Sequence, residues 1–332
     1  MSHRSAAIRK LAFLAALLLS TAAQAQLFRA YLASDGLDAN PCTLQQPCRL
    51  LPAALAAVAS GGEIWMLDSA NYNTTTVTIG KSVTILAVPG VVGSVVTPVS
   101  GNAINITAAS LEVSLRNLVI VPLPLANGHG IEMTGASKLM VQDCQFSNLQ
   151  QVALLAWAGT VVVEGSTFRG NGSGVYVLGN TAAVVTRSTI VDNEDYGVIA
   201  LNTIASTTST LEVSDSVIQG GLTCVGAVGN GASSIVSVVV SGSRISGCTF
   251  GAASQHGGSA SATLNATNNT ISHNGTAGLI TFGGKLFASG NSVHANTTGL
   301  KNDSGIFESA GNNAVRNNGT PTAGTITPVG LN

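Results

Sequence analysis

A repeat of about 22 residues runs through the second half of the sequence and constrains the fold more than any other feature. Its clearest mark is a column of apolar residues: Phe146, Phe168, Ile190, Ile218, Ile245, Ile271, Val293 and Val315. Successive members lie 22, 22, 28, 27, 26, 22 and 22 residues apart. Such a unit is too short for a pair of helices but fits one coil of a β-solenoid, with three short strands and three bends. The longer intervals predict loops inserted at one bend, in residues 199–209, 226–234 and 252–262.

Two polar columns accompany the apolar one. Two residues before each apolar position stand Cys144, Ser166, Ser188, Ser216, Ser243, Asn269, Asn291 and Asn313. Three residues after it, five positions are asparagine: Asn171, Asn193, Asn274, Asn296 and Asn318. Coils that stack about 4.8 Å apart place equivalent side chains over one another. We therefore expect the asparagines to form a ladder of side-chain amide hydrogen bonds, each asparagine adopting the left-handed conformation of the bend.

The fold predicted from these patterns is one all-β domain, residues 26–332, shaped as a parallel β-helix. Its strands alternate with period 2, so that Val161 and Val163 point inward. Strand-like segments at 63–67, 77–79, 83–85 and 111–113 continue the pattern upstream, which sets the coils at about 63–318. Residues 49–60, rich in Ala and Leu, predict a short α-helix that is stopped by Gly61 and Gly62. Because a solenoid has an open apolar end, we expect this helix to cap it.

The N-terminal residues 1–25 have the pattern of an export signal. Three cations, Arg4, Arg9 and Lys10, precede an apolar run at 11–19, and Ala23-Gln24-Ala25 offers a small-x-small cleavage site. The run is too short to cross a bilayer, which takes roughly 20 residues. We expect cleavage between Ala25 and Gln26 and a secreted or periplasmic protein that is not integral to the membrane.

Composition and cysteine usage agree with export. Outside residues 1–25 the chain has 14 − 3 = 11 Lys and Arg against 15 Asp and Glu, so it lacks the basic face that nucleic acid binding needs. Cys42 and Cys48 bracket five residues and predict a local disulfide. Cys224 and Cys248 lie roughly one coil apart, which predicts a second disulfide. Cys144 falls in the buried polar column and is expected to be a free thiol. No Cys/His grouping has metal-site spacing, and no cofactor is expected.

The opening of the chain carries a resemblance to a known group of proteins. Residues 31–83, with ASDGLDANPCT, PCRLLPAALAAV, GGEI and KSV, resemble the start of secreted bacterial right-handed parallel β-helix repeat proteins of the pectate-lyase-like superfamily. The repeats with V-x-x-S/N-x-I-x-x-N resemble the same group. The resemblance implies a right-handed coil. It also implies a range of functions: carbohydrate lyases, hydrolases and epimerases, phage tail-spikes and adhesins.

Ionisable residues converge at only one place on the predicted surface, the strand that opens each repeat. The candidate catalytic residues there are Glu164, Arg187 and Asp215. The candidate ligand-binding residues are Asp143, Trp157 and Glu212. A glycosidase needs two carboxylates about 5–10 Å apart, which Glu164 and Asp215 satisfy if they lie two coils apart. A β-eliminating lyase needs a base, a role open to Arg187. Trp157 offers a ring for sugar stacking.

Two other interpretations of the same surface stay open. Arg187 lies one coil from both Glu164 and Asp215, so the charges also fit an ion-pair ladder without catalytic function. Outward apolar residues on these strands predict a docking stripe: Met140, Val162, Val184, Val239 and Phe287. We therefore predict an exported module that binds a glycan, such as a polysaccharide or a cell-surface glycan, or another surface partner. The alternative is a polysaccharide lyase or glycoside hydrolase.

Overall fold

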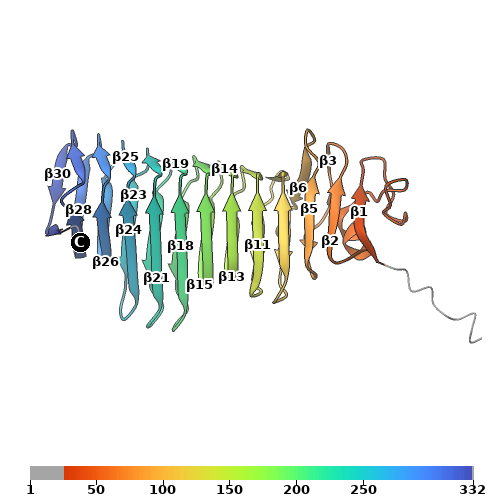
Figure 1. Ribbon diagram of the computed structural model, residues 1–332, viewed down its shortest axis with the longest axis horizontal. Coiled ribbons are helices and arrows are strands. Elements are labelled where there is room, and N and C mark those ends of the chain that lie inside the picture. The colour runs from red at the N-terminus through yellow and green to blue at the C-terminus, as the bar shows by residue number, and fades with distance from the viewer. Residues whose placement is uncertain (1–25, 331–332) are drawn as a thin grey trace, which may run out of the picture.

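The computed structural model describes residues 26–330, which coil into an elongated parallel β-solenoid (Figure 1). The predicted export signal, residues 1–25, lies outside the described residues. Every strand pairing is parallel, and the strands form three faces along the axis. We name them face A, face B and face C in the order in which the chain visits them within one coil of the predicted repeat.

Face A holds the longest row of strands and carries most of the large arrows of Figure 1. Its strands are β1 (Leu27–Leu32), β2 (Val58–Met66), β5 (Val83–Ala87), β8 (Glu112–Arg116), β11 (Ser137–Gln142), β18 (Thr208–Ser214), β21 (Ile235–Ser241), β24 (Ser261–Thr267) and β31 (Thr327–Val329). Face C consists of β4 (Val77–Thr78), β7 (Ile104–Ile106), β10 (Ile131–Met133), β17 (Tyr196–Asn202), β20 (Thr223–Gly229), β23 (Phe250–His256) and β30 (Thr320–Ala323). Four long strands run through face C and continue into face A: β13 (Val152–Glu164), β15 (Ser173–Thr186), β26 (Ala277–Ser289) and β28 (Thr298–Ala310).

Face B is a separate sheet of 11 short strands between two tight bends. They are β3 (Ala70–Asn71), β6 (Gly93–Thr97), β9 (Leu118–Pro122), β12 (Gln145–Ser147), β14 (Thr167–Arg169), β16 (Thr189–Val191), β19 (Val217–Gln219), β22 (Arg244–Ser246), β25 (Thr270–Ser272), β27 (Ser292–His294) and β29 (Ala314–Arg316). The predicted apolar column is confirmed, because its members pair in order from Phe146 to Val315 through these strands. The rings of Phe146 and Phe168 stack with their centroids 4.6 Å apart.

The predicted asparagine ladder is present. The side-chain amide of Asn171 donates to Oδ1 of Asn193 at 2.9 Å, and Asn274, Asn296 and Asn318 are linked in the same way. The left-handed residue, however, is the one before each asparagine, for example Asp192 with φ 55°. The asparagine contributes the hydrogen bonds of its side-chain amide. The expectation that it adopts the left-handed conformation of the bend is wrong.

The bend between faces A and B carries a second ladder, made by the other polar column. The backbone N–H of Ser166 donates to Oγ of Ser188, and that of Ser188 donates to Oγ of Ser216. From Asn269 onward, asparagine amides form the same links. All of these side chains except Asn313 are buried, so the ladder satisfies polar groups that would otherwise lack partners inside the coil.

The only helix in the described residues, α2 (Leu51–Ala57), is shorter than the predicted 49–60. It ends because Val58 is extended and begins β2, so the strand runs through Gly61 and Gly62 instead of the helix stopping there. Its buried residues Leu51, Ala54 and Leu55 join the main core, and α2 contacts β1, β2 and β4. No helix in residues 26–330 is long and apolar enough to cross a bilayer.

Both predicted disulfides are present, Cys42–Cys48 and Cys224–Cys248, with Cα atoms 4.6 Å and 5.8 Å apart. Cys144 is a buried free thiol, as expected. The predicted loops lie at the corner between faces C and A. They are shorter than expected, at residues 203–207, 230–234 and 257–260, because β17, β20 and β23 extend toward the corner.

Candidate functional site: two grooves on faces A and C

Face A presents an outward row of side chains along the axis. Pairing places Met140 beside Val162 and Val184, and the same row continues through Glu212 and Val239 to Asn265 and Phe287. The predicted alignment of outward apolar residues is therefore confirmed. Glu212 interrupts the stripe with one carboxylate.

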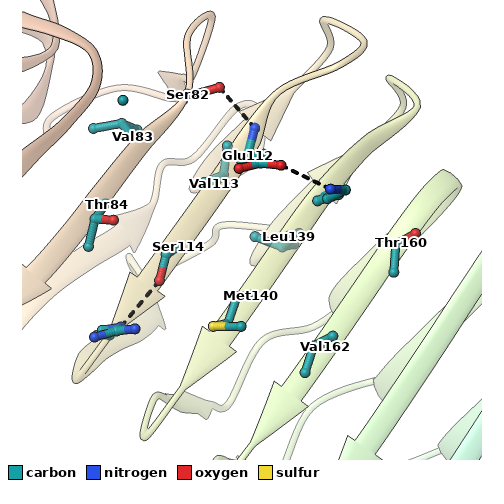
Figure 2. A pocket seen from close by; sticks show the side chains of 13 residues that line it. Ser82, Val83, Thr84, Glu112, Val113, Ser114, Leu139, Met140, Thr160 and Val162 are labelled. Atoms are coloured by element: carbon teal, nitrogen blue, oxygen red, sulfur yellow. Dashed lines mark hydrogen bonds and ion pairs between the residues drawn. The ribbon is translucent and has the colours of Figure 1, made fainter.

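A groove of about 410 Å³ lies over the first part of this row (Figure 2). Met140 and Val162 lie along it, and Thr84, Ser114 and Thr160 add hydroxyl groups around them. Lys138 Nζ and Glu112 Oε1 form an exposed ion pair at 2.9 Å at one edge of the groove. At the other end Arg116 Nε donates to Ser114 Oγ at 3.3 Å.

A second hollow of about 200 Å³ continues the groove toward the C-terminal coils. It shares Thr160 with the first hollow and is lined by Val184, Glu212 and Val239. Together the two hollows form what we call the axial groove, which runs from β5 to β21. Six strand spacings give it a length of roughly 29 Å. Of the candidate ligand-binding residues, Glu212 is the one that lines it.

The three candidate catalytic residues lie at the edge of face A beside the bend toward face B. Glu164 ends β13, accepts a hydrogen bond from Gln142 Nε2 at 3.1 Å and forms an ion pair with Arg187. Within residues 26–330, no ion pair joins Arg187 to Asp215. The ion-pair interpretation therefore holds for one of its two predicted links.

Backbone conformation explains which residue types occupy several positions of this cluster. Asp143, Arg187 and Asp215 have φ values of 53°, 49° and 49°, in the left-handed region that Asp, Asn and Gly tolerate best. In the coil after each aspartate the same position is a glycine. A Cβ built on Gly165 would lie 2.6 Å from Asp143 Oδ1, and one on Gly242 would lie 2.7 Å from Asp215 Oδ1. The two aspartates thus have a structural reason to be where they are.

Trp157 lies away from that cluster, on face C. It is 37% exposed, and its indole N–H donates to Glu132 Oε1 at 3.2 Å. Glu132 Oε2 accepts from Asn102 Nδ2 at 2.7 Å, so the carboxylate is held from both sides. Its partners are these two residues and not His129, whose Nδ1 accepts from the backbone N–H of Val152. Burial lowers the pKa of His129 below its usual range, which favours the neutral ring.

Beside Trp157 lies a groove of about 370 Å³, also lined by Tyr176, Tyr196 and Asp195. The two tyrosine rings meet edge to face, with centroids 6.1 Å apart. Desolvation raises the pKa of Tyr176 to about 12, with smaller effects of Tyr196 and Asp195, so the phenol is neutral at physiological pH. We call this hollow the aromatic groove.

A smaller hollow of about 120 Å³ follows along face C. It shares Tyr196 with the aromatic groove and is lined by Phe250 and Phe282, whose centroids are 5.5 Å apart. The repeat pattern does not reveal this row, because its aromatic residues do not recur at one column. A signal exists in part: Tyr196 and Phe250 occupy the same register position, with Thr223 between them. In residues 26–330, no group of three or more His, Cys, Asp or Glu side chains is placed to hold a metal ion.

Comparison with known proteins identifies the architecture. Residues 89–236 match a family described as "Right handed beta helix region". None of the curated proteins matches the sequence. Among solved structures, the pectate lyase Pel9A is similar at 12% identity over 87% of this chain and 78% of its own, with a TM-score of 0.50. The GH136 lacto-N-biosidase from Eubacterium ramulus is similar at 9% identity over 91% of this chain and 68% of its own, with a TM-score of 0.51.

A third structure, the A-module of the mannuronan C-5 epimerase AlgE4 from Azotobacter vinelandii, aligns at 12% identity over 81% of this chain and 86% of its own, with a TM-score of 0.48. At these identities the likeness concerns the fold. The likeness to Pel9A, the parallel coils, the stacked columns and the family match over residues 89–236 together identify the fold as a right-handed parallel β-helix.

Proposed function

We propose that the protein is an exported module that binds an extended saccharide chain along the axial groove of face A. The observation that carries the proposal is the shape and chemistry of this groove, about 29 Å of hollow surface by strand spacing with Met140, Val162, Val184 and Val239 along it. Hydroxyl groups of Thr84, Ser114 and Thr160 border the apolar residues. Pyranose rings are amphipathic in the same way, because their C–H faces are apolar and their hydroxyl edges are polar.

Two further observations support this proposal. The solved structures with a similar fold include a pectate lyase and a lacto-N-biosidase, both named for carbohydrate substrates. The two disulfides are typical of proteins that leave the reducing cytosol, which supports export. A glycan outside the cytoplasm is then the polymer that this surface meets.

Binding without turnover is the form of the proposal that the geometry favours. Glu164 is neutralised by Arg187 and hydrogen-bonded to Gln142, which makes it a poor proton donor or nucleophile at rest. Asp215 serves the bend as a left-handed residue. Neither carboxylate belongs to the residues that line the axial groove.

The test is a comparison of two lysine substitutions in the same outward row. Val162→Lys places a long charged side chain inside the axial groove, whereas Asn265→Lys places the same side chain one strand beyond Val239, the last residue of this row that lines the groove. We expect Val162→Lys to weaken retention in affinity gels cast with polysaccharides by 10-fold or more, and Asn265→Lys to leave it unchanged. Equal retention of both variants and the wild type would refute binding along this groove.

The second candidate is a polysaccharide lyase or glycoside hydrolase that uses Glu164, Arg187 and Asp215. What favours it is spacing, because Glu164 and Ser214 belong to the same register column two strands apart. Asp215 therefore lies roughly 10 Å from Glu164, at the edge of the range for an inverting hydrolase. New reducing ends or unsaturated products that disappear in Glu164→Gln would establish this activity. Retained binding without any product would exclude it for the polysaccharides tested.

A further inference from the structure

We propose that the aromatic groove of face C is a second, separate saccharide site that takes a neutral pyranose unit. Its residues line neither part of the axial groove, so the site is independent of the function proposed for face A. Three features carry the proposal: a ring held in place before any ligand arrives, two tyrosine side chains that line the same groove, and a lining whose charge excludes acidic sugars.

Trp157 is the residue that is held in place. Its N–H is bonded to Glu132, and Glu132 is bonded in turn to Asn102, so that the indole cannot rotate without breaking this chain of hydrogen bonds. Even so, 37% of the residue stays exposed beside a groove of about 370 Å³. An exposed ring with a fixed orientation binds a flat apolar partner at little cost in conformational entropy. A pyranose ring offers such a partner in its C–H face.

The remaining lining supplies hydrogen-bonding groups at the edge of the rings. Tyr176 and Tyr196 present neutral phenols, because burial raises the pKa of both. Gln150, Gln151 and Ser173 add amide and hydroxyl groups. A pocket with an aromatic wall and a few polar groups at its edge is the usual form of a small-ligand site, and it suits a ring with hydroxyl groups along its rim.

Charge decides the class of sugar. Asp195 lines the aromatic groove, and Glu132 accepts the hydrogen bond of Trp157, while no Lys or Arg is among the lining residues. A uronate would place its carboxylate beside like charges without a cation to pair with, which is unfavourable. The groove therefore selects a neutral unit. The hollow formed by Tyr196, Phe250 and Phe282 continues it along face C and gives room for a neighbouring unit of the same chain.

The chain offers a direct readout, because it has two tryptophans, Trp65 and Trp157. In Trp65→Phe, emission at 340 nm reports on Trp157 alone. We expect the emission to change and saturate when this variant, expressed from the full-length sequence, is titrated with a panel of cellohexaose, mannohexaose, xylohexaose and galactohexaose. At least one member should act below 10 mM, and hexagalacturonate should have no effect. No response to any neutral member, or an equal response to hexagalacturonate, would overturn the proposal.

Calorimetry with the responding oligosaccharide then shows whether a variant loses affinity because it lacks the stacking ring or because it is not folded. Trp157→Ala should weaken binding at the aromatic groove by 10-fold or more, whereas Trp157→Phe, which keeps a ring but loses the N–H, should retain it within about threefold. Tyr176→Ala should weaken it as well, and far-UV circular dichroism checks that each variant is folded. Val162→Lys should leave this binding unchanged, so that failure of the axial groove and failure of the aromatic groove are distinguishable. Unchanged affinity in Trp157→Ala would refute the site.

Discussion

Replacement of Asn193 by alanine tests whether the asparagine ladder holds neighbouring coils together. Asn193 is 1% exposed, and its Oδ1 accepts from both the backbone N–H and the side-chain amide of Asn171, at 3.1 Å and 2.9 Å. Its own amide donates to the carbonyl oxygen of Phe168 at 3.2 Å. The substitution therefore removes three hydrogen bonds between adjacent coils without touching the apolar column.

The magnitude follows from the groups left without partners. Two buried donors of Asn171 lose their acceptor, and each unsatisfied buried polar group costs about 1–3 kcal/mol. The Asn193→Ala variant should therefore lose about 2–6 kcal/mol of unfolding free energy. The matched control is Asn318→Ala at the C-terminal end of the same ladder. Asn318 accepts the corresponding two bonds from Asn296 but is half-exposed, so water can replace it and the loss should be about 1 kcal/mol.

Urea unfolding followed by far-UV circular dichroism measures both values. Each variant must unfold with the slope of the wild type, because a change in slope would mean that the coils no longer unfold together. If Asn193→Ala and Asn318→Ala lose the same amount within about 0.5 kcal/mol, burial of the ladder does not determine its contribution. The reasoning would then be wrong.

The other predictions concern the disulfide, the buried thiol and one bend. Replacing Cys224 and Cys248 with alanine should lower the unfolding free energy by about 3.5 kcal/mol, the loop-closure value for a separation of 24 residues, and a loss under about 1 kcal/mol would contradict it. Burial raises the pKa of Cys144 from its ordinary 9.0 to about 12. The contribution of the neutral thiol to the unfolding free energy is therefore complete below pH 9 and is lost as the pH rises through 12. By pH 11 the wild type should therefore lose about 3 kcal/mol more, relative to pH 8, than Cys144→Ala, and parallel pH profiles would refute this. Gly242→Ala should cost about 1–3 kcal/mol, because φ is +59° and the new Cβ meets Asp215, and its melting temperature should recover in part when Asp215→Gly is added. No recovery would show that the contact does not matter.

The sequence predicted the architecture well because stacking repeats its constraints in every coil. The apolar column from Phe146 to Val315 pairs in register throughout, and both disulfides join the expected cysteines. The end of the helix was placed wrongly. Val58 pairs with Leu27 of β1, a contact distant in sequence, so the strand takes residues that local composition assigned to the helix.

The candidate site was less predictable, although part of the signal was present. The column of Asp143 and Asp215 also contains Gly165, Gly242 and Asn268, a set typical of the left-handed conformation, and all five have positive φ. That composition indicates a bend more strongly than a catalytic row. Trp157 was harder to place, because β13 turns from face C to face A directly after it. A single register shift there decides which groove the ring lines.

The distribution of the ladders explains why both grooves lie where they do. The two bends that flank face B are fixed by stacked polar side chains. In the asparagine ladder, Gly221 and Cys248 stand where two coils lack the asparagine, and Cys248 is bonded to Cys224. Little can be inserted at these bends without breaking a chain of buried hydrogen bonds. The corner between faces C and A has no such continuous ladder in the described residues, and the loops 203–207, 230–234 and 257–260 are all inserted there. From β12 onward, variation in length is therefore confined to the edge that the axial groove and the aromatic groove share, so binding residues can change on either side of it while the coil stays intact.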